Sequence, residues 1–305
     1  MTNYIIKRLA LALIVLFGVA TIVFFLVRMT GDPVRLLLPP EATEEQVEEM
    51  RIKLGYDRPL YVQYGEFMGK LAQLDLGRSL RYNEPAGSLI MERIPKTVSL
   101  ALMGIGIAVV LSFILGTLAA LNRGKAVEQL IMSFSIFGQS MPAFWFGILL
   151  ILGFAVYLRW LPTGGMGDFR NYILPAVALG LRPAALMTRM LRSSMVEVLD
   201  ADFIRTARAK GLSRTRVILR HALRNSLLPV ITLIGGEFGS ILGGSVVIET
   251  IFAWPGIGQL LSQAISYRDF PLVQAVIITI AGWFVFVNLA VDILYAYVDP
   301  RIRYE

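Results

Sequence analysis

Few side chains in this sequence could carry out covalent chemistry. The 305 residues include no cysteine and one histidine, His221, so disulfides, thiolate metal sites, cysteine nucleophiles and histidine clusters are excluded. The GxxxxGK[ST] phosphate loop, the GxSxG nucleophile elbow and the HExxH zinc motif are also missing. Intrinsic enzymatic activity is therefore not expected, and any ATP that the protein uses would have to be bound by another chain.

Two acidic residues lie inside long apolar runs, Glu237 and Asp292. An acid within a membrane is costly and rarely faces lipid. Each could contact a cationic or peptide substrate, or it could pair inside a helix bundle, with Arg182 and Arg189 as candidate partners. Asp292 stands near the end of its run, which favours pairing there, and both interpretations stay open for Glu237.

The densest pattern of charge is Asp200–Pro229, which reads DADFIRTARAKGLSRTRVILRHALRNSLLP. Asp200 or Asp202 suits a helix N-terminus, Gly211 can end that helix in a left-handed conformation, and Ser213 can cap the next one. The residues at helical spacing are Ala201, Ile204, Ala207 and Lys210. The pattern predicts a short charged helix, a glycine turn and a second helix. Such a helix could lie on anionic lipid or dock another protein.

The elements that must position these residues are membrane spans. Hydrophobic residues make up 56% of the chain and charged residues 17%, the mean hydropathy is +0.65, and the apolar residues come in long runs. The six expected spans are Leu9–Val27, Thr97–Asn122, Gln129–Leu158, Tyr172–Met190, Ser226–Ile248 and Phe270–Val291. Thr250–Tyr267 is interrupted by Pro255 and Gly256, so it is expected to be interfacial or re-entrant. The first run is longer than a signal peptide requires and is expected to be retained.

The basic residues distribute unevenly between the two sides that six spans would define. One side collects Lys7, Arg8, Arg123, Lys125, Arg192, Arg205, Arg208, Lys210, Arg214, Arg216, Arg220, Arg224, Arg301 and Arg303. The short loops opposite carry Arg159, Arg170 and Arg268. The positive-inside rule then predicts that both termini are cytoplasmic. The net charge of +7 therefore follows the membrane topology, and no nucleic-acid partner is expected.

The Arg28–Lys96 segment, nearly neutral with 10 basic and 11 acidic residues, would lie outside. Thr43 and Gln46 fit a capping box, and Gly55 can stop the helix that it opens. The apolar face of that helix would consist of Val47, Met50 and Leu54. After Pro59, an amphipathic stripe follows, made of Tyr61, Tyr64, Phe67, Leu71 and Leu74. The segment could be a lid on the membrane domain or a docking surface for an external partner.

Residues 205–211 resemble the EAA loop of membrane subunits of bacterial binding-protein-dependent ABC importers. Arg205, Thr206 and Ala207 stand in the places of the EAA tripeptide, and Gly211 in the place of its glycine. Arg205 departs from the acid, Thr206 from an alanine, and the later proline of the motif is missing. RTARAKG followed by LRHALRN is similar to the dipeptide, oligopeptide and nickel branch, and to the first of its two permeases. The segments that agree are NYIIKRL near the start, GDP at Gly31–Pro33, DLGRSL at Asp75–Leu80, LGGSVVIETIFAWPGIG at Leu242–Gly258, RDFPLVQ at Arg268–Gln274 and DPRIRY at Asp299–Tyr304.

The resemblance implies an all-α, multi-pass protein of the bacterial inner membrane with about six transmembrane helices and both termini inside. It implies a first span at 1–28, a periplasmic helical loop at 29–96, a permease core at 97–297 and a cytoplasmic tail at 298–305. The implied partners are membrane lipid, a second homologous permease, one or two P-loop ATPases that hold ATP and Mg, and an extracytoplasmic binding protein. The coupling helix that would dock the ATPases lies between spans four and five. Its residues would be Phe203, Ile204, Arg205, Ala207, Lys210 and Gly211, with Phe203 and Ile204 as apolar anchors and Ala207 allowing close approach.

Prolines and glycines indicate parts that could move. Pro142 should kink the third span, and Trp254, Pro255 and Gly256 should bend the chain at the outer surface near a gate. Simple helix packing is the alternative for both features. The alternative functions are a self-contained secondary transporter or channel, and a membrane scaffold. Internal repeats that mark many secondary transporters are not evident. The implied substrates range over dipeptides, oligopeptides, glutathione, nickel chelates and sugars, with peptide as the default.

Overall fold

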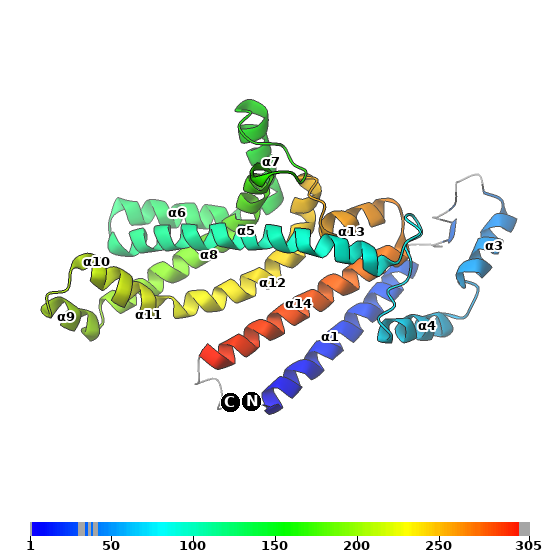
Figure 1. The fold of residues 1–305 in the computed structure, drawn as a ribbon, viewed down its shortest axis with the longest axis horizontal. Coiled ribbons are helices and arrows are strands. Elements are labelled where there is room, and N and C mark those ends of the chain that lie inside the picture. Colours follow the sequence, from blue (N-terminus) through cyan, green and yellow to red (C-terminus); the bar gives the residue numbers. More distant parts are fainter. Residues whose placement is uncertain (1, 30–33, 36–37, 39–41, 299–305) are drawn as a thin grey trace. The chain divides into compact units, whose positions relative to one another are not determined.

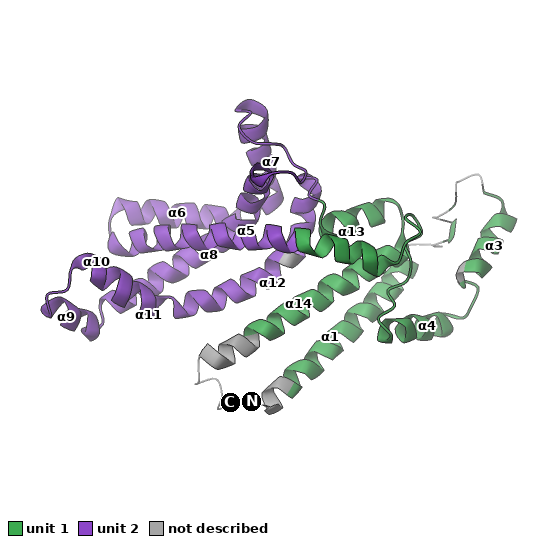
Figure 2. Ribbon diagram, viewed as in Figure 1, with its two compact units in different colours: residues 1–96, 255–293, 303–305 green, residues 97–254, 294–302 purple. Residues whose placement is uncertain are grey.

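The computed structural model describes residues 2–29, 34–35, 38 and 42–298, and in that part of the chain the regular elements are helices (Figure 1). The all-α prediction is confirmed. These residues form two compact units, one of 2–96 and 255–293 and one of 97–254 and 294–298 (Figure 2). The segments Gly31–Pro33 and Asp299–Tyr304 and the side chain of Asp292 lie outside the described residues.

Unit 1 begins with α1 (Thr2–Met29) and α3 (Glu44–Leu54). The capping box predicted for α3 is confirmed, since Thr43 accepts from the Gln46 amide and the Gln46 side chain accepts from the Thr43 amide. Gly55 ends the helix in the left-handed conformation, with φ of 73°. Local sequence alone therefore determines both ends of this helix.

The helix α4 (Leu60–Ala72) packs its aromatic residues on the end of α1. The rings of Tyr64 and Phe67 lie 5.2 and 5.4 Å from that of Phe24. The predicted stripe was wrong at its two ends, because Tyr61 is 78% and Leu74 87% exposed. Tyr61 lies in the first turn, and Leu74 follows the helix with a φ of 60°, which turns it away from the stripe.

The core of unit 1 joins three segments that are distant in sequence. The start of α5 (Ala86–Leu121) contributes apolar side chains, and α13 (Ile257–Ser266) and α14 (Phe270–Val298) supply the others. The fully buried members include Ile90, Leu260 and Leu272. At 10 residues, α13 is about 15 Å long, too short to cross a bilayer. Thr250–Tyr267 is thus a helix end, a turn and a short packed helix.

Unit 2 is built around α8 (Phe169–Leu199), whose neighbours are α6 (Ala126–Ser140), α7 (Ala143–Leu150) and α12 (Leu228–Ile251). The remaining elements are the π-helix η1 (Ile151–Tyr157), α9 (Asp202–Ala209), α10 (Arg214–Arg216), the π-helix η2 (Val217–Leu223) and α11 (Arg224–Ser226). A close crossing holds α5 and α8 together. A Cβ atom on Gly180 would lie 2.6 Å from the Gly104 carbonyl oxygen.

Among the residues that the structure describes, four helices are long and apolar enough to cross a membrane, namely α1, α5, α8 and α14. Two bent pairs bring the number to six if each is one span. The expected third span, Gln129–Leu158, is one of these pairs: α6 and the continuous helix formed by α7 and η1 meet at a bend of 106°. In the other pair, the helical segment 214–226 meets α12 at a bend of 52°. A single kinked span was therefore too simple: Met141 and Pro142 leave the helical conformation altogether.

Candidate functional site

The predicted charged helix is α9, and it ends as the sequence indicated. Gly211 has a φ of 75°, its amide donates to the Arg208 carbonyl at 2.9 Å, and the Leu212 amide donates to the Ala207 carbonyl at 3.4 Å. These two bonds form a Schellman motif. The acid predicted at the helix N-terminus is Asp202, which is the first helical residue, and Ala201 occupies the N-cap.

The two faces of α9 have different environments. Ile204 is fully buried and Ala207 nearly so, in a cluster with Met195, Val217 and Ala222. The neighbouring Phe203 is 45% exposed. The interpretation of Ile204 and Ala207 as direct contacts for another protein therefore needs correction, because both side chains pack against their own unit.

The exposed face of α9 is basic. Arg205 and Lys210 are exposed, and Arg205 approaches Asp202 at 3.4 Å within the same helix. A groove of about 500 Å³ lies beside it, lined by Ala120, Leu121, Leu199, Arg208, Leu212, Arg214, Val217 and Ile218. The surface thus combines positive charge, one exposed aromatic ring and an adjoining groove.

An ionic network that sequence reasoning missed supports this region. Glu128, at the start of α6, accepts the Gly124 amide at 2.6 Å and the Arg192 Nε at 2.6 Å. Arg123 pairs with Asp200 at 2.9 Å, where α8 ends. The two links fasten the α5–α6 turn to α8 immediately before α9. From the sequence, Asp200 was a candidate for a helix N-terminus and Arg123 and Arg192 were counted among the basic residues of one side, but no ion pair involving any of them was predicted.

At the other end of unit 2, a buried polar cluster surrounds the end of α12. Glu249 is fully buried and accepts from the Thr97 hydroxyl at 2.8 Å. Trp254 is also fully buried, with its ring 4.5 Å from that of Tyr172. Glu249 was expected at the start of a short loop, Glu249–Asp269, because the expected span ended at Ile248, but α12 continues to Ile251 and carries this carboxylate inward.

The chain turns after α12 at an alanine. Ala253 has a φ of 47°, and the Trp254 amide donates to the Glu249 carbonyl at 2.7 Å. The bend was predicted at Trp254, Pro255 and Gly256, and these residues do lie in the break between α12 and α13, with Gly256 at the N-cap of α13. Non-glycine residues rarely adopt positive φ, so no local pattern indicated that Ala253 would adopt this conformation.

Within the spans, the proposed partnership of Glu237 with arginine is not present. Glu237 is half-buried in α12, Arg189 is half-buried in α8 and Arg182 is exposed. Among acids whose side chains the structure describes, none lies within 4.0 Å of either arginine. The Nε atom of Arg189 is buried without a hydrogen-bond partner.

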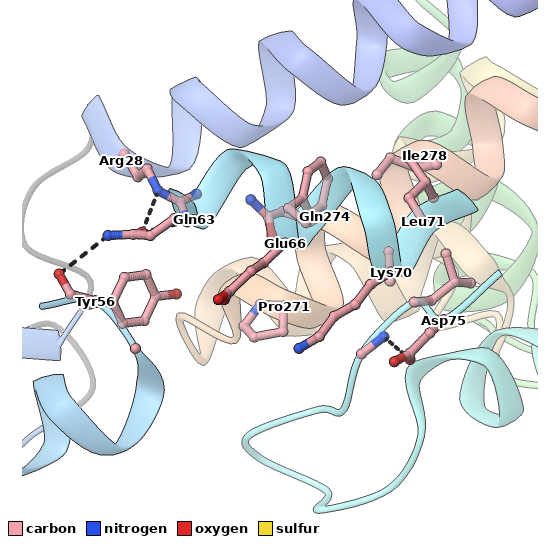
Figure 3. Close-up of a pocket in the computed structure, with 15 residues that line it drawn as sticks. Arg28, Tyr56, Gln63, Glu66, Lys70, Leu71, Asp75, Pro271, Gln274 and Ile278 are labelled. Atoms are coloured by element: carbon pink, nitrogen blue, oxygen red, sulfur yellow. Dashed lines mark hydrogen bonds between the residues drawn. The ribbon is translucent and has the colours of Figure 1, made fainter. Parts of the chain in front are cut away.

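Unit 1 contains a separate polar cavity of about 170 Å³, shown in Figure 3. Arg28 donates to the Gln63 side chain at 2.9 and 3.1 Å, and Gln63 donates in turn to the Tyr56 carbonyl at 3.3 Å. Burial raises the pKa of the Tyr56 hydroxyl above its ordinary value, and the positive charge of Arg28 offsets part of that rise. Tyr56 therefore stays protonated near neutral pH.

A buried carboxylate also organises the loop before α5. Asp269 is almost fully buried and accepts from the Ser79 hydroxyl, from the Arg81 amide at 3.1 Å and from the Leu272 amide at 3.2 Å. It thereby caps α14 and fixes the 79–81 loop. Ser79 of the DLGRSL segment and Asp269 of the RDFPLVQ segment are therefore hydrogen-bonded to each other.

Comparisons with known proteins cover the whole chain. Residues 112–304 match the family described as binding-protein-dependent transport system inner membrane component, and residues 1–101 match its N-terminal part. The chain is 44% identical to the glutathione transport system permease protein GsiC of Escherichia coli strain K12 and 43% identical to that of Shigella boydii serotype 4. Both alignments include 306 positions and all of each chain.

The fold also resembles solved transporters. An inward-facing structure of the MetNI methionine ABC transporter aligns with a TM-score of 0.56 and 18% identity, over 71% of this chain and 99% of that one. A crystal structure of an amino acid ABC transporter aligns with a TM-score of 0.53 and 16% identity, over 70% and 94%. The chain belongs to the family of binding-protein-dependent transport system inner membrane components, and it is a multi-pass permease subunit of a bacterial ABC importer.

Proposed function

We propose that α9 is the coupling helix through which P-loop ATPases, holding ATP and Mg, drive this permease. The observation that carries the proposal is the two-sided environment of α9. Phe203, Arg205 and Lys210 are exposed for contact with another protein, while Ile204 and Ala207 fasten the helix to its own unit. A force applied to the exposed face would therefore be transmitted to α8 and to the helix that leads into α12.

The chain would work with a second homologous permease, one or two ATPase subunits, an extracytoplasmic binding protein and the surrounding lipid. The termini and α9 would be cytoplasmic, and 29–96 would form a periplasmic loop between the first span at 1–28 and the core at 97–297. The tail at 298–305 would be cytoplasmic. Family membership sets aside a self-contained secondary transporter or channel. ATP hydrolysis is assigned to the partners, because the chain lacks a phosphate loop.

The transported solute is proposed to be a small peptide, since two full-length relatives carry the name glutathione transport system permease. Glu237, Pro142, Trp254, Pro255 and Gly256 are proposed to line or gate the pathway. The break at Pro142 and the turn before Gly256 are places where rigid helices meet, which suits a rigid-body change between inward and outward states.

The test is to replace the exposed face of α9 and leave its buried face intact. The double variant Phe203→Ala with Arg205→Glu should insert normally and retain the second permease, but lose most of the co-purifying ATPase. Lys125→Glu, an exposed cytoplasmic charge change in the α5–α6 turn, is the control and should retain it. Full ATPase retention and coupled hydrolysis in the double variant would contradict the proposal. So would isolation of the unmodified chain as a lone, active homo-oligomer.

A further inference from the structure

The helix α8 combines two properties that seldom occur together in a membrane span. Of the four continuous candidate spans it is the least apolar and also the most buried within the chain. Its exposed strip nevertheless carries Arg182, which lies 13 residues from its first residue, Phe169. At 1.5 Å per residue, Arg182 lies about 20 Å from the first residue of α8 and about 26 Å from its last, near the middle of the candidate span.

Arg189 lies on the same face, because seven residues correspond to nearly two helical turns. The two Cα positions are about 10 Å apart along the axis. Neither arginine has a carboxylate within 4.0 Å among the described side chains, and the Arg189 Nε is buried without an acceptor. Among the described side chains, these two positive charges therefore have no neutralising partner.

Glu237, the acid in the neighbouring helix α12, does not neutralise the two arginines. Glu237 lies 14 residues before the end of α12, and the outer ends of α8 and α12 are linked because the Gly165 amide donates to the Phe252 carbonyl at 2.7 Å. Counted from those ends, Glu237 and Arg182 have similar depth, yet no ion pair joins them. With respect to the described side chains, both guanidinium groups are thus available to bind a further partner.

An exposed arginine at this depth is too costly to face lipid, so it must face water or a partner. We propose that Arg182 and Arg189 form a cationic track on the translocation pathway that recognises a carboxylate group of the transported solute. The planar guanidinium group matches a carboxylate with two parallel hydrogen bonds. Two such groups one above the other would let the solute pass from one to the next. The inference rests on the permease function and assigns a substrate class to its pathway.

The first experiment measures whether water reaches position 182 and whether the electrostatic potential there is positive. It does not require the identity of the solute. The chain contains no cysteine, so Arg182→Cys introduces one defined thiol into this subunit. The complex, purified with its partners into nanodiscs, would be treated with an anionic sulfonatoethyl or a cationic trimethylammonioethyl methanethiosulfonate. Leu102→Cys, at an exposed apolar position of α5, is the lipid-facing control and should remain unmodified.

The thiol at position 182 should react, and the anionic reagent should react roughly tenfold faster relative to the cationic one, because Arg189 attracts it. Adding Arg189→Met should remove that preference. An unreactive thiol at 182, or a reactive one without charge preference, would overturn the proposal.

The second experiment compares Ala-Ala with its C-terminal amide in ATP-dependent uptake by proteoliposomes. Arg182→Met should reduce uptake of the acid about tenfold, as expected for a lost charged hydrogen bond, and change uptake of the amide less than twofold. Arg182→Lys should retain part of the uptake of the acid that Arg182→Met loses. Arg170→Met, an exposed arginine in the first turn of α8, is the matched control.

Equal loss for acid and amide would assign the arginines a structural role and overturn the inference. Loss of the second permease from the Arg182→Met complex would show that the track faces that subunit, and it would also overturn the inference. If the unmodified complex contains ATPases but transports neither probe, the carboxylate assignment fails while the importer assignment stands. Absence of ATPase subunits from the complex would instead refute the proposed coupling.

Discussion

Phe203 and Ile204 are adjacent apolar residues on α9, and replacing each by alanine should have different consequences. Ile204→Ala should lower local stability, whereas Phe203→Ala should weaken ATPase binding. Ile204 is fully buried in a small cluster with Met195, Val217 and Ala222. Ile204→Ala removes three carbon atoms at about 0.8 kcal/mol each and leaves a cavity, for a total of about 3 kcal/mol. Phe203 is 45% exposed, so Phe203→Ala should cost less than about 0.5 kcal/mol.

The loss should be local, because the cluster is small and joins α9 to the ends of α5 and α8 and to η2. A cost of about 3 kcal/mol raises the population of the opened form roughly 150-fold. Hydrogen–deuterium exchange in nanodiscs should therefore accelerate by about two orders of magnitude in peptides covering 202–212 of the Ile204→Ala variant. Peptides covering 86–96 serve as the internal control and should not change.

Phe203→Ala should leave exchange in 202–212 unaltered but weaken ATPase co-purification. Unchanged exchange in Ile204→Ala would refute the assignment of Ile204 as the internal anchor. Comparable acceleration in both variants would refute the separation of α9 into a buried and an exposed face.

Other perturbations test the remaining structural assignments. Gly180→Val should lower the melting temperature of the purified subunit by several degrees, because even a Cβ would meet the Gly104 carbonyl at 2.6 Å; an unchanged melting temperature would count against that helix crossing. Asp269→Ala should increase proteolysis of the loop before α5, since it removes three hydrogen-bond acceptor contacts, whereas Asp75→Ala, which loses one, should change it little. Burial raises the pKa of Tyr56, so the contribution of its protonated hydroxyl to folding stability is complete below about pH 10 and is lost as pH rises through the folded-state pKa. Tyr56→Phe should therefore flatten the alkaline part of a curve of folding stability against pH.

Local sequence was sufficient for many helix ends. The Thr43–Gln46 capping box and the glycines at 55 and 211 function within a few residues of chain, and all are confirmed. The turn at Ala253 could not be foreseen, because an alanine with positive φ has no local advantage. Its conformation depends on the buried groups around it, including Glu249 and Trp254.

Long apolar runs located the spans, since a bilayer admits only helices of a minimum length. They did not determine how a run is divided. Pro142 indicated a kink in the third run, but a bend of 106° with two separate helices reflects packing against α8 and α12 rather than the proline alone.

The sequence by itself determined the class of protein: a basic, cysteine-free, multi-span chain with a charged helix and glycine turn similar to an importer coupling loop. Only the tertiary structure decided which side chains of those segments face inward, because helical periodicity defines a face but not its neighbour. Ile204 packs inside while Phe203 is exposed, and Glu249 is buried although it was expected in a loop. Arg182 remains exposed in a candidate span and forms no ion pair with Glu237, one of the two acids that sequence alone had offered as partners.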